Sequence, residues 1–246
     1  MEMMRIAYLD PVPEEAAIAL FLDELKKHAG PDTEVSYHTL EKGADNYEYQ
    51  VYETCMGPLI LNKIRQLEAE GYDGVVLGCF YDPVLEAARE MCDHIVVTGA
   101  AQGAVTLASL LSARFSLLIP RDKNYTHMRE MVVKNGALEK LASIRVLNIR
   151  VLDLQDSEIT DRRMEEEIET AIKQDHAEAI VLACTMEAGK YEALQKKYQV
   201  PVIDPAVAGL KLNEYLIRCR KDCGWYVSKM GTYETPSQEE WESYHF

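Results

Sequence analysis

Short apolar runs alternate with amphipathic helical segments along the whole chain. A continuous run such as GVVLG at 74–78 is typical of a parallel strand that is buried on both faces. We predict strands at 5–9, 34–40, 74–78, 94–99, 114–120, 143–154, 177–184 and 200–204. We predict helices at 14–29, 58–70, 83–91, 101–112, 122–135, 161–175, 187–198 and 205–219, with a loop over 41–57. This alternation indicates an α/β protein with parallel sheets and right-handed crossovers.

Two segments share one plan. GYDGVVLGCFYDP (71–83) and HAEAIVLACTMEA (176–188) each run from an apolar strand through a small residue and a cysteine to helix-starting residues. The separation of Cys79 and Cys184 (184 − 79 = 105 residues) is about the length of one small α/β lobe. We therefore predict two similar lobes, each a mostly parallel sheet flanked by helices. Residues 1–98 with 205–246 would form the lobe that carries Cys79, and 99–204 the lobe that carries Cys184.

Composition narrows the class of protein. Of 246 residues, 48% are apolar and 27% are charged, so the chain can bury a sizeable core. A formal net charge of −15 argues against nucleic acid as a partner. No run approaches the roughly 20 apolar residues of a membrane span, and no signal peptide is visible. We expect a cytoplasmic protein without membrane contact that binds a small molecule.

The cysteine pattern excludes some chemistry. Six cysteines in a chain of this length are too sparse for a disulfide scaffold, and no C-x-x-C occurs, so we expect no metal site. A cysteine at the tip of a strand faces unpaired N–H groups and the positive end of the next helix, which favours the thiolate. Asp82-Pro83 is predicted to be the N-cap and first residue of that helix after Cys79, and Thr185 is a candidate cap after Cys184.

Two thiols on opposite sides of one carbon can invert its configuration. One thiolate removes a proton, the opposing thiol returns one on the other face, and nearby backbone N–H groups stabilise the enolate. Taken singly, a cysteine is more often an inert buried residue, but the paired placement of Cys79 and Cys184 favours catalysis. The other cysteines lack that context and are expected to be inert: Cys55, Cys92, Cys219 and Cys223.

At these residues the chain resembles the aspartate/glutamate/hydantoin racemase superfamily, and most of all its hydantoin racemase branch. CFYDP (79–83) resembles the branch's C-F-x-D-P around the first catalytic cysteine, and LAC (182–184) resembles the strand end that carries the second. PVIDPAVAGLKLNEYL (201–216) resembles the closing strand and helix, and SKMGTY (228–233) with Pro236 is similar to the S-[KR]-x-G-x-Y tail. The resemblance implies a site in a cleft between the lobes, Cys79 and Cys184 as acid/bases, no cofactor, and a homo-oligomer.

Three departures from the family pattern concern the substrate. Family members commonly have N-P-N-[ST] after the first strand, whereas this chain has LDPV at 9–12, with the Asp10 carboxylate in place of an amide. An ionised Asp10 would repel a carboxylate substrate and could accept a hydrogen bond from an N–H or a hydroxyl. The second cysteine is followed by TME instead of A-G-M or T-H, and the strand at 115–119 ends in Ile119-Pro120 instead of threonines. The residues expected to contact substrate are Asp10, Gly78, Phe80, Tyr81, Thr98, Gln102, Thr185 and Met186.

Three further features have open interpretations. VTGAAQGA (97–104) is either an anion cradle or a tightly packed small-residue helix. His127 has no visible partner. The aromatic tail at 224–246 is expected to pack over the body or at a subunit interface, with a lid over the cleft as the alternative.

We expect a cofactor-independent racemase or epimerase that inverts a carbon next to a carbonyl, in a 5-substituted hydantoin or a related amino-acid derivative. Two alternatives stay open. One is a decarboxylase or cis–trans isomerase of a small dicarboxylic acid on the same scaffold. The other is a non-catalytic protein that binds or senses a small molecule.

Overall fold

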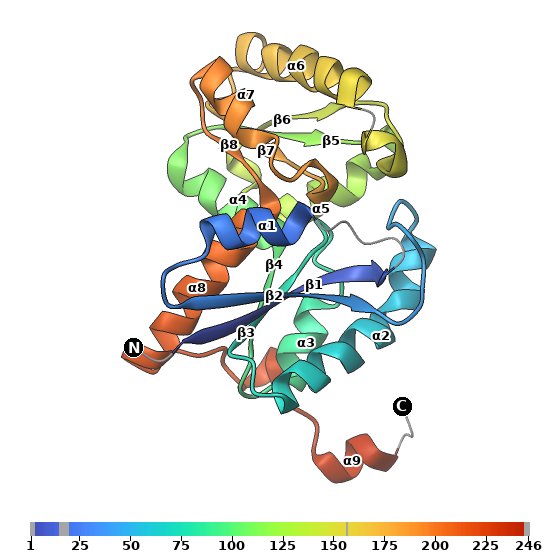
Figure 1. Ribbon diagram of the computed structural model, residues 1–246, viewed down its shortest axis with the longest axis vertical. Coiled ribbons are helices and arrows are strands. Elements are labelled where there is room, and N and C mark those ends of the chain that lie inside the picture. The colour runs from blue at the N-terminus through green and yellow to red at the C-terminus, as the bar shows by residue number, and fades with distance from the viewer. Residues whose placement is uncertain (1–2, 15–19, 156, 244–246) are drawn as a thin grey trace.

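The computed structural model describes residues 3–14, 20–155 and 157–243. Within these ranges, two four-stranded parallel sheets form two lobes, which lie one above the other in Figure 1. The first sheet has the order β2-β1-β3-β4 and the second has the order β6-β5-β7-β8. The strands are β1 (Met4–Pro13), β2 (Thr33–Leu40), β3 (Gly74–Leu77), β4 (Val96–Gly99), β5 (Phe115–Ile119), β6 (Leu141–Val146), β7 (Ala179–Leu182) and β8 (Val202–Ile203). The predicted two-lobed α/β fold is confirmed.

Helices cover both faces of each sheet. Their bounds are α1 (Leu20–His28), α2 (Gln50–Ala69), α3 (Leu85–Met91), α4 (Ala100–Leu111), α5 (Tyr125–Lys134), α6 (Ser157–Lys173), α7 (Tyr191–Tyr198), α8 (Pro205–Cys223) and α9 (Gln238–Ser243). Helices α1 and α8 pack on one face of the first sheet, and α6 and α7 on the outer face of the second. Helix α4 packs along α8 and also contacts β7, so the middle of the molecule joins the lobes.

The two strands that lead to the cysteines occupy equivalent places, third in the order of their sheets. In β3, Val75 and Leu77 pack into the core between the lobes, whereas Val76 faces α1 and α8. In β7, Val181 faces that shared core and Ile180 the opposite one. Because both faces are covered, every residue of these strands is buried, which accounts for the continuous apolar runs.

Two predicted elements were wrong. Helix α2 begins at Gln50, so residues 50–57 are not a loop, and Pro58 lies inside the helix instead of at its start. A buried stripe extends upstream of the proline to Met56 at helical spacing, and its packing outweighs the lost N–H. The segment 143–154 is not one strand, because β6 ends at Val146 and Asn148 adopts a left-handed conformation with φ of 60°. The predicted helix at 14–29 is observed from residue 20, and residues 15–19 lie outside the described ranges.

The start of the helix after Cys79 was also predicted wrongly. Helix α3 begins at Leu85, after Asp82 and Val84 adopt left-handed conformations, so Asp82 is not its N-cap. The Asp82 carboxylate instead accepts hydrogen bonds of 2.8 Å from the backbone N–H groups of Ala101 and Gln102. It therefore caps α4 and occupies two of the N–H groups that could have cradled an anion at 97–104.

The division of the chain into 1–98 with 205–246 and 99–204 remains a proposal. Helix α8 packs on strands of the first sheet, as that division requires. In the tail, Lys229 Nζ donates to the carbonyls of Arg89 and Cys92 at the end of α3. Trp225 and Tyr226 are 66% and 72% exposed, so this part of the tail does not pack over the body of the chain. A subunit interface there stays a prediction.

In the described part of the chain, no helix combines the length and the apolar character needed to cross a membrane.

Candidate active site

Both candidate cysteines line one cavity between the lobes. Cys79 and Cys184 each follow their strand, β3 or β7, by two residues. The two turns are joined directly, since Thr185 Oγ1 donates a hydrogen bond of 3.0 Å to the carbonyl of Gly78. The space between its lining residues, with the open solvent at its mouth included, is about 580 Å³. Its lining residues are Asp10, Pro11, Val12, Asp45, Asn46, Tyr47, Gly78, Cys79, Phe80, Tyr81, Pro120, Asn124, Met128, Val151, Ala183, Cys184, Thr185 and Met186.

The two thiols have matching surroundings. Each sulfur accepts a hydrogen bond from the backbone N–H two residues further along the chain, that of Tyr81 for Cys79 and that of Met186 for Cys184. The internal repeat seen in the sequence is therefore also a repeat in the geometry of the site. Two thiols placed in this way on one cavity can act on two faces of a bound carbon.

Burial raises the pKa of both thiols, and the N–H bonds to the sulfurs oppose this rise only in part. The sequence had indicated the opposite, a thiolate favoured by a helix start. The expectation fails because α3 begins only at Leu85, and a 3₁₀ turn, Thr185–Glu187, follows Cys184 in place of an α-helix. Among the described lining residues there is no Lys, Arg or His side chain that would lower these pKa values.

Asp10 lies in the last part of β1, three residues before its end at Pro13, and lines the same cavity. Its carboxylate Oδ2 accepts a hydrogen bond of 2.5 Å from Tyr37 Oη on β2, and the residue is 9% exposed. Burial raises the pKa of Asp10 to about 6, while the hydrogen bond from Tyr37 lowers it. Above that pH the site presents an acceptor with a negative charge.

Tyr81 belongs to a polar and aromatic group on the wall of the cavity. Its Oη accepts a hydrogen bond from Asn124 Nδ2, and its ring stacks on His127 with centroids 4.2 Å apart. His127 Nδ1 also lies 3.9 Å from a carboxylate oxygen of Glu53. The expectation that His127 has no partner was wrong, because both partners come from the first lobe and are distant in sequence.

The structure brings together six of the eight predicted substrate-contacting residues and separates two. Besides Asp10 and Tyr81, it places Gly78, Phe80, Thr185 and Met186 on the cavity. Thr98 and Gln102 do not line it. Thr98 Oγ1 is fully buried and accepts a hydrogen bond of 3.0 Å from Asn213 on α8, and Gln102 Oε1 accepts one of 2.7 Å from Arg89 on α3.

Sequence reasoning missed several lining residues that lie away from the strand ends carrying the cysteines. Asp45, Asn46 and Tyr47 come from the segment after β2, and Asn124, Met128 and Val151 come from the second lobe. The acidic and tyrosine-rich composition of 41–57 was a visible signal, but nothing local indicated which residues face the cavity.

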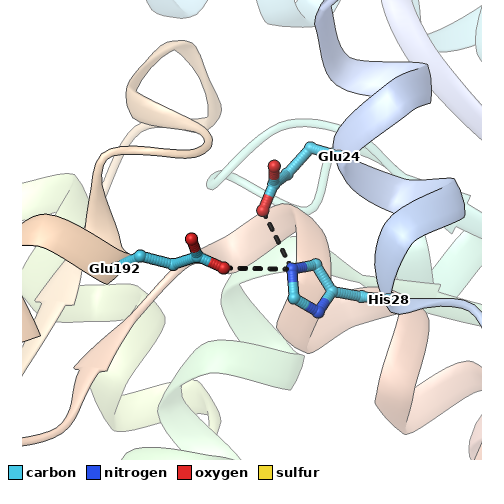
Figure 2. A group of neighbouring side chains, drawn as sticks. All are labelled: Glu24, His28 and Glu192. Carbon is cyan, nitrogen blue, oxygen red and sulfur yellow. Dashed lines mark hydrogen bonds and ion pairs between the residues drawn. The ribbon is translucent and has the colours of Figure 1, made fainter.

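One group of described residues has the donor atoms to hold a metal ion. Ligand atoms of Glu24, His28 and Glu192 lie within 4.8 Å of one another, between α1 and α7 (Figure 2). Lys27 Nζ lies 2.5 Å from the Glu192 carboxylate, and His28 Nε2 lies 2.9 Å from that of Glu24. An ion-pair network between the lobes accounts for this cluster, and none of its members lines the cavity.

The fold and the site define a class: a two-lobed α/β protein with one cysteine from each lobe facing a shared cavity. The model of the family described as Asp/Glu/Hydantoin racemase matches residues 15–212. The chain belongs to this family, so the resemblance seen in the sequence is confirmed.

Several relatives agree with this assignment. A hydantoin racemase from Pseudomonas sp. (strain NS671) is 34% identical over 239 residues, which cover 97% of this chain and 94% of the relative. A second hydantoin racemase, from Rhizobium meliloti, is 35% identical and covers 95% of both chains. Among solved structures, an allantoin racemase from Klebsiella pneumoniae superimposes with a TM-score of 0.88 at 28% identity, over 96% of this chain and 94% of its own. The protein is therefore an isomerase of the racemase type, and a non-catalytic role is set aside.

Proposed function

We propose that this protein racemises a 5-substituted hydantoin, or a closely related cyclic amide, with Cys79 and Cys184 as the two acid/bases. The observation that carries the proposal is the matched placement of the thiols, at equivalent strand ends and on one cavity. The names of the relatives support the substrate class, and allantoin is itself a hydantoin with a ureido group on C5.

The reaction transfers one proton on each face of C5. The thiolate of one cysteine takes the C5 proton and becomes a thiol, while the electron pair of the broken C–H bond moves into the adjacent carbonyl to give an enolate. The thiol of the other cysteine then protonates C5 from the opposite face and becomes the thiolate. The configuration is inverted, the roles of Cys79 and Cys184 are exchanged, and no electron is gained or lost.

The charges on the cavity favour a neutral substrate with N–H donors. The described lining includes two carboxylates, Asp10 and Asp45, and no cationic side chain. A dicarboxylic acid would meet like charges without a partner, which argues against the decarboxylase and cis–trans isomerase alternatives. A hydantoin is uncharged, and its ring N–H groups can donate to the Asp10 carboxylate.

Exchange of the C5 proton in D₂O tests the proposal. Enantiopure 5-substituted hydantoins, allantoin, aspartate and glutamate would each be incubated with the protein, with the α-proton followed by NMR and the enantiomers by chiral chromatography. We expect exchange and inversion with hydantoins, and loss of inversion in both Cys79→Ser and Cys184→Ser. Cys223→Ser, which changes an exposed thiol away from the cavity, is the control and should behave as wild type.

Two outcomes would overturn the proposal. Exchange with aspartate or glutamate but with no hydantoin would reject the substrate class. Inversion that continues undiminished in both cysteine variants would reject the two-thiol mechanism.

A further inference from the structure

The segment that joins β2 to α2 reaches from the first lobe to the second. We call residues 41–49 the strap; in Figure 1 it is the blue loop between these two elements. Asp45, Asn46 and Tyr47 of the strap line the cavity. The next residue, Glu48, does not line the cavity and has no part in the proton transfers.

Glu48 is 3% exposed, and its buried carboxylate is bonded to residues of the second lobe. Its Oε2 accepts a hydrogen bond of 3.1 Å from Arg121 Nη1, and its Oε1 accepts one of 2.7 Å from the backbone N–H of Val151. Its own carbonyl accepts a bond of 3.4 Å from Asn124 Nδ2. One residue of the first lobe is thus bonded to three residues of the second.

These partners belong to the walls of the cavity. Asn124 and Val151 line it, and Asn124 Nδ2 also donates to Tyr81 Oη on the opposite lobe. Within the strap, Tyr47 Oη donates a bond of 2.9 Å to the carbonyl of Pro11, another lining residue. Glu48 therefore joins the strap and both lobes at the edge of the cavity.

A second contact holds the same segment on the second lobe. The ammonium of Lys123 lies 4.8 Å from the centre of the Tyr49 ring, and a hydrogen bond with Tyr49 helps to raise the pKa of Arg121. The start of the strap is fixed on the first lobe. Gly43 there approaches Met56 of α2 so closely that a Cβ would lie 1.9 Å from its methyl carbon. The strap is thus held on the first lobe at Gly43 and on the second lobe at Glu48. We call the bonds of the Glu48 carboxylate with Arg121 and Val151 the clasp.

We propose that Glu48 is a positioning residue that holds the strap closed over the bound substrate, and that substrate enters and leaves when the Glu48–Arg121 clasp opens. The inference rests on the proposed racemase function, which supplies the substrate. A buried carboxylate needs its partners, and removing one of them leaves an unpaired charge or an unpaired donor. The clasp therefore holds the strap in one defined geometry, and a single substitution of Glu48 or Arg121 can break it.

The matched substitutions are Glu48→Gln and Glu86→Gln. In Glu48→Gln the amide oxygen of Gln can still accept a hydrogen bond from the Val151 N–H. Its NH₂ group, however, is a donor placed against the Arg121 donors, so the bond to Arg121 is lost. Glu86 of α3 forms an ion pair of 2.7 Å with Lys134 of α5, which also links the lobes, but this pair is exposed and does not touch the cavity. The control thus removes an inter-lobe carboxylate without disturbing the strap.

The first measurement needs no substrate. Alkylation of Cys79 and Cys184 by iodoacetamide at pH 8 would be followed residue by residue by mass spectrometry. We expect the rate to rise severalfold in Glu48→Gln and to stay at the wild-type value in Glu86→Gln. Equal rates in wild type and Glu48→Gln would overturn the proposal, whatever the racemase assay shows. Arg121→Gln, which breaks the same clasp from its half-exposed side, should repeat the result if Glu48→Gln does not fold.

The second measurement is the kinetics of hydantoin racemisation. Because the strap contacts substrate and transition state alike, we expect KM to rise roughly tenfold in Glu48→Gln, the effect of one charged hydrogen bond, with kcat nearly unchanged. Glu48→Asp, which keeps the charge, should restore part of the affinity. A fall in kcat at constant KM would reject the positioning role. Faster alkylation in Glu48→Gln, together with a wild type that racemises no hydantoin, would refute the proposed function and leave the clasp standing.

Discussion

Replacing Asp10 with asparagine should remove a pH-dependent contribution to the stability of the fold, and it should lower activity. Asp10 is 9% exposed and receives a hydrogen bond from Tyr37 Oη. Tyr37 can donate to an amide oxygen as it does to a carboxylate, so Asp10→Asn removes mainly the ionisation. The effect on stability therefore follows from the pKa of Asp10, which burial raises to about 6.

The sign and size of the effect follow from proton linkage. The folded chain holds the proton of Asp10 up to about pH 6, whereas the unfolded chain loses it near the ordinary pKa of 3.8. Protonation thus stabilises the fold below pH 4, and this contribution, about 3 kcal/mol at its limit, is lost as the pH rises through 6. About 1.4 kcal/mol of it is still present at pH 5, and essentially none at pH 8.

Urea denaturation at pH 5 and pH 8 measures this contribution. The free energy of unfolding of wild type relative to Asp10→Asn should fall by about 1.4 kcal/mol between the two pH values. Asp45→Asn is the control, because it makes the same chemical change at an exposed carboxyl on the same cavity. A difference between wild type and Asp10→Asn that does not change with pH would refute the reasoning.

The same replacement should lower the racemase activity. Losing a charged acceptor for a substrate N–H removes about 1.5–3 kcal/mol of binding, or roughly ten- to hundredfold in kcat/KM. The wild-type kcat/KM for a hydantoin should rise through pH 6 as Asp10 ionises, and this step should be absent in Asp10→Asn. A step that persists in the variant would assign the titration to another group.

Three further predictions concern the thiols and the packing of α8. Alkylation of Cys79 and Cys184 should accelerate about tenfold per pH unit from pH 7 to 9, because burial raises the pKa of both thiols and the thiolate fraction still grows there; a plateau would contradict this. Asp204→Ala should lower the free energy of unfolding in urea by about 1–2 kcal/mol, since Asp204 accepts two N–H bonds at the start of α8; an unchanged midpoint would contradict this. Gly103→Ala should lower it by about 1–3 kcal/mol, because the new Cβ would lie 2.6 Å from the α8 backbone, and a neutral effect would show that α4 can shift.

Much of the fold could be predicted because its causes are local. The strands at 74–77 and 179–182 are buried on both faces, and such burial is visible as an uninterrupted apolar run. The pairing of Cys79 with Cys184 could be inferred because equivalent strand ends carry equivalent residues. Family membership followed from the same segments.

The features that could not be predicted depend on partners distant in sequence. Asp82 looked like a cap for the helix that follows it, but its carboxylate caps the N-terminus of α4, about 20 residues later. Thr98 and Gln102 lie near the expected site, yet α8 and α3 supply their hydrogen-bond partners. The Glu48 clasp joins residues 73 and 103 positions apart, so no local pattern could indicate it.

The sequence by itself determined the layers, the two-lobed repeat and the placement of Cys79 and Cys184 at equivalent strand ends, because periodicity and strand ends are properties of neighbouring residues. Tertiary structure decided the direction in which the pKa values of these two thiols are shifted, and which residues line the cavity. Burial between the lobes raises the pKa of both thiols, where a local helix start had suggested the reverse. Desolvation depends on everything packed around a group, and that surrounding exists only once the two sheets, α4 and the strap have come together.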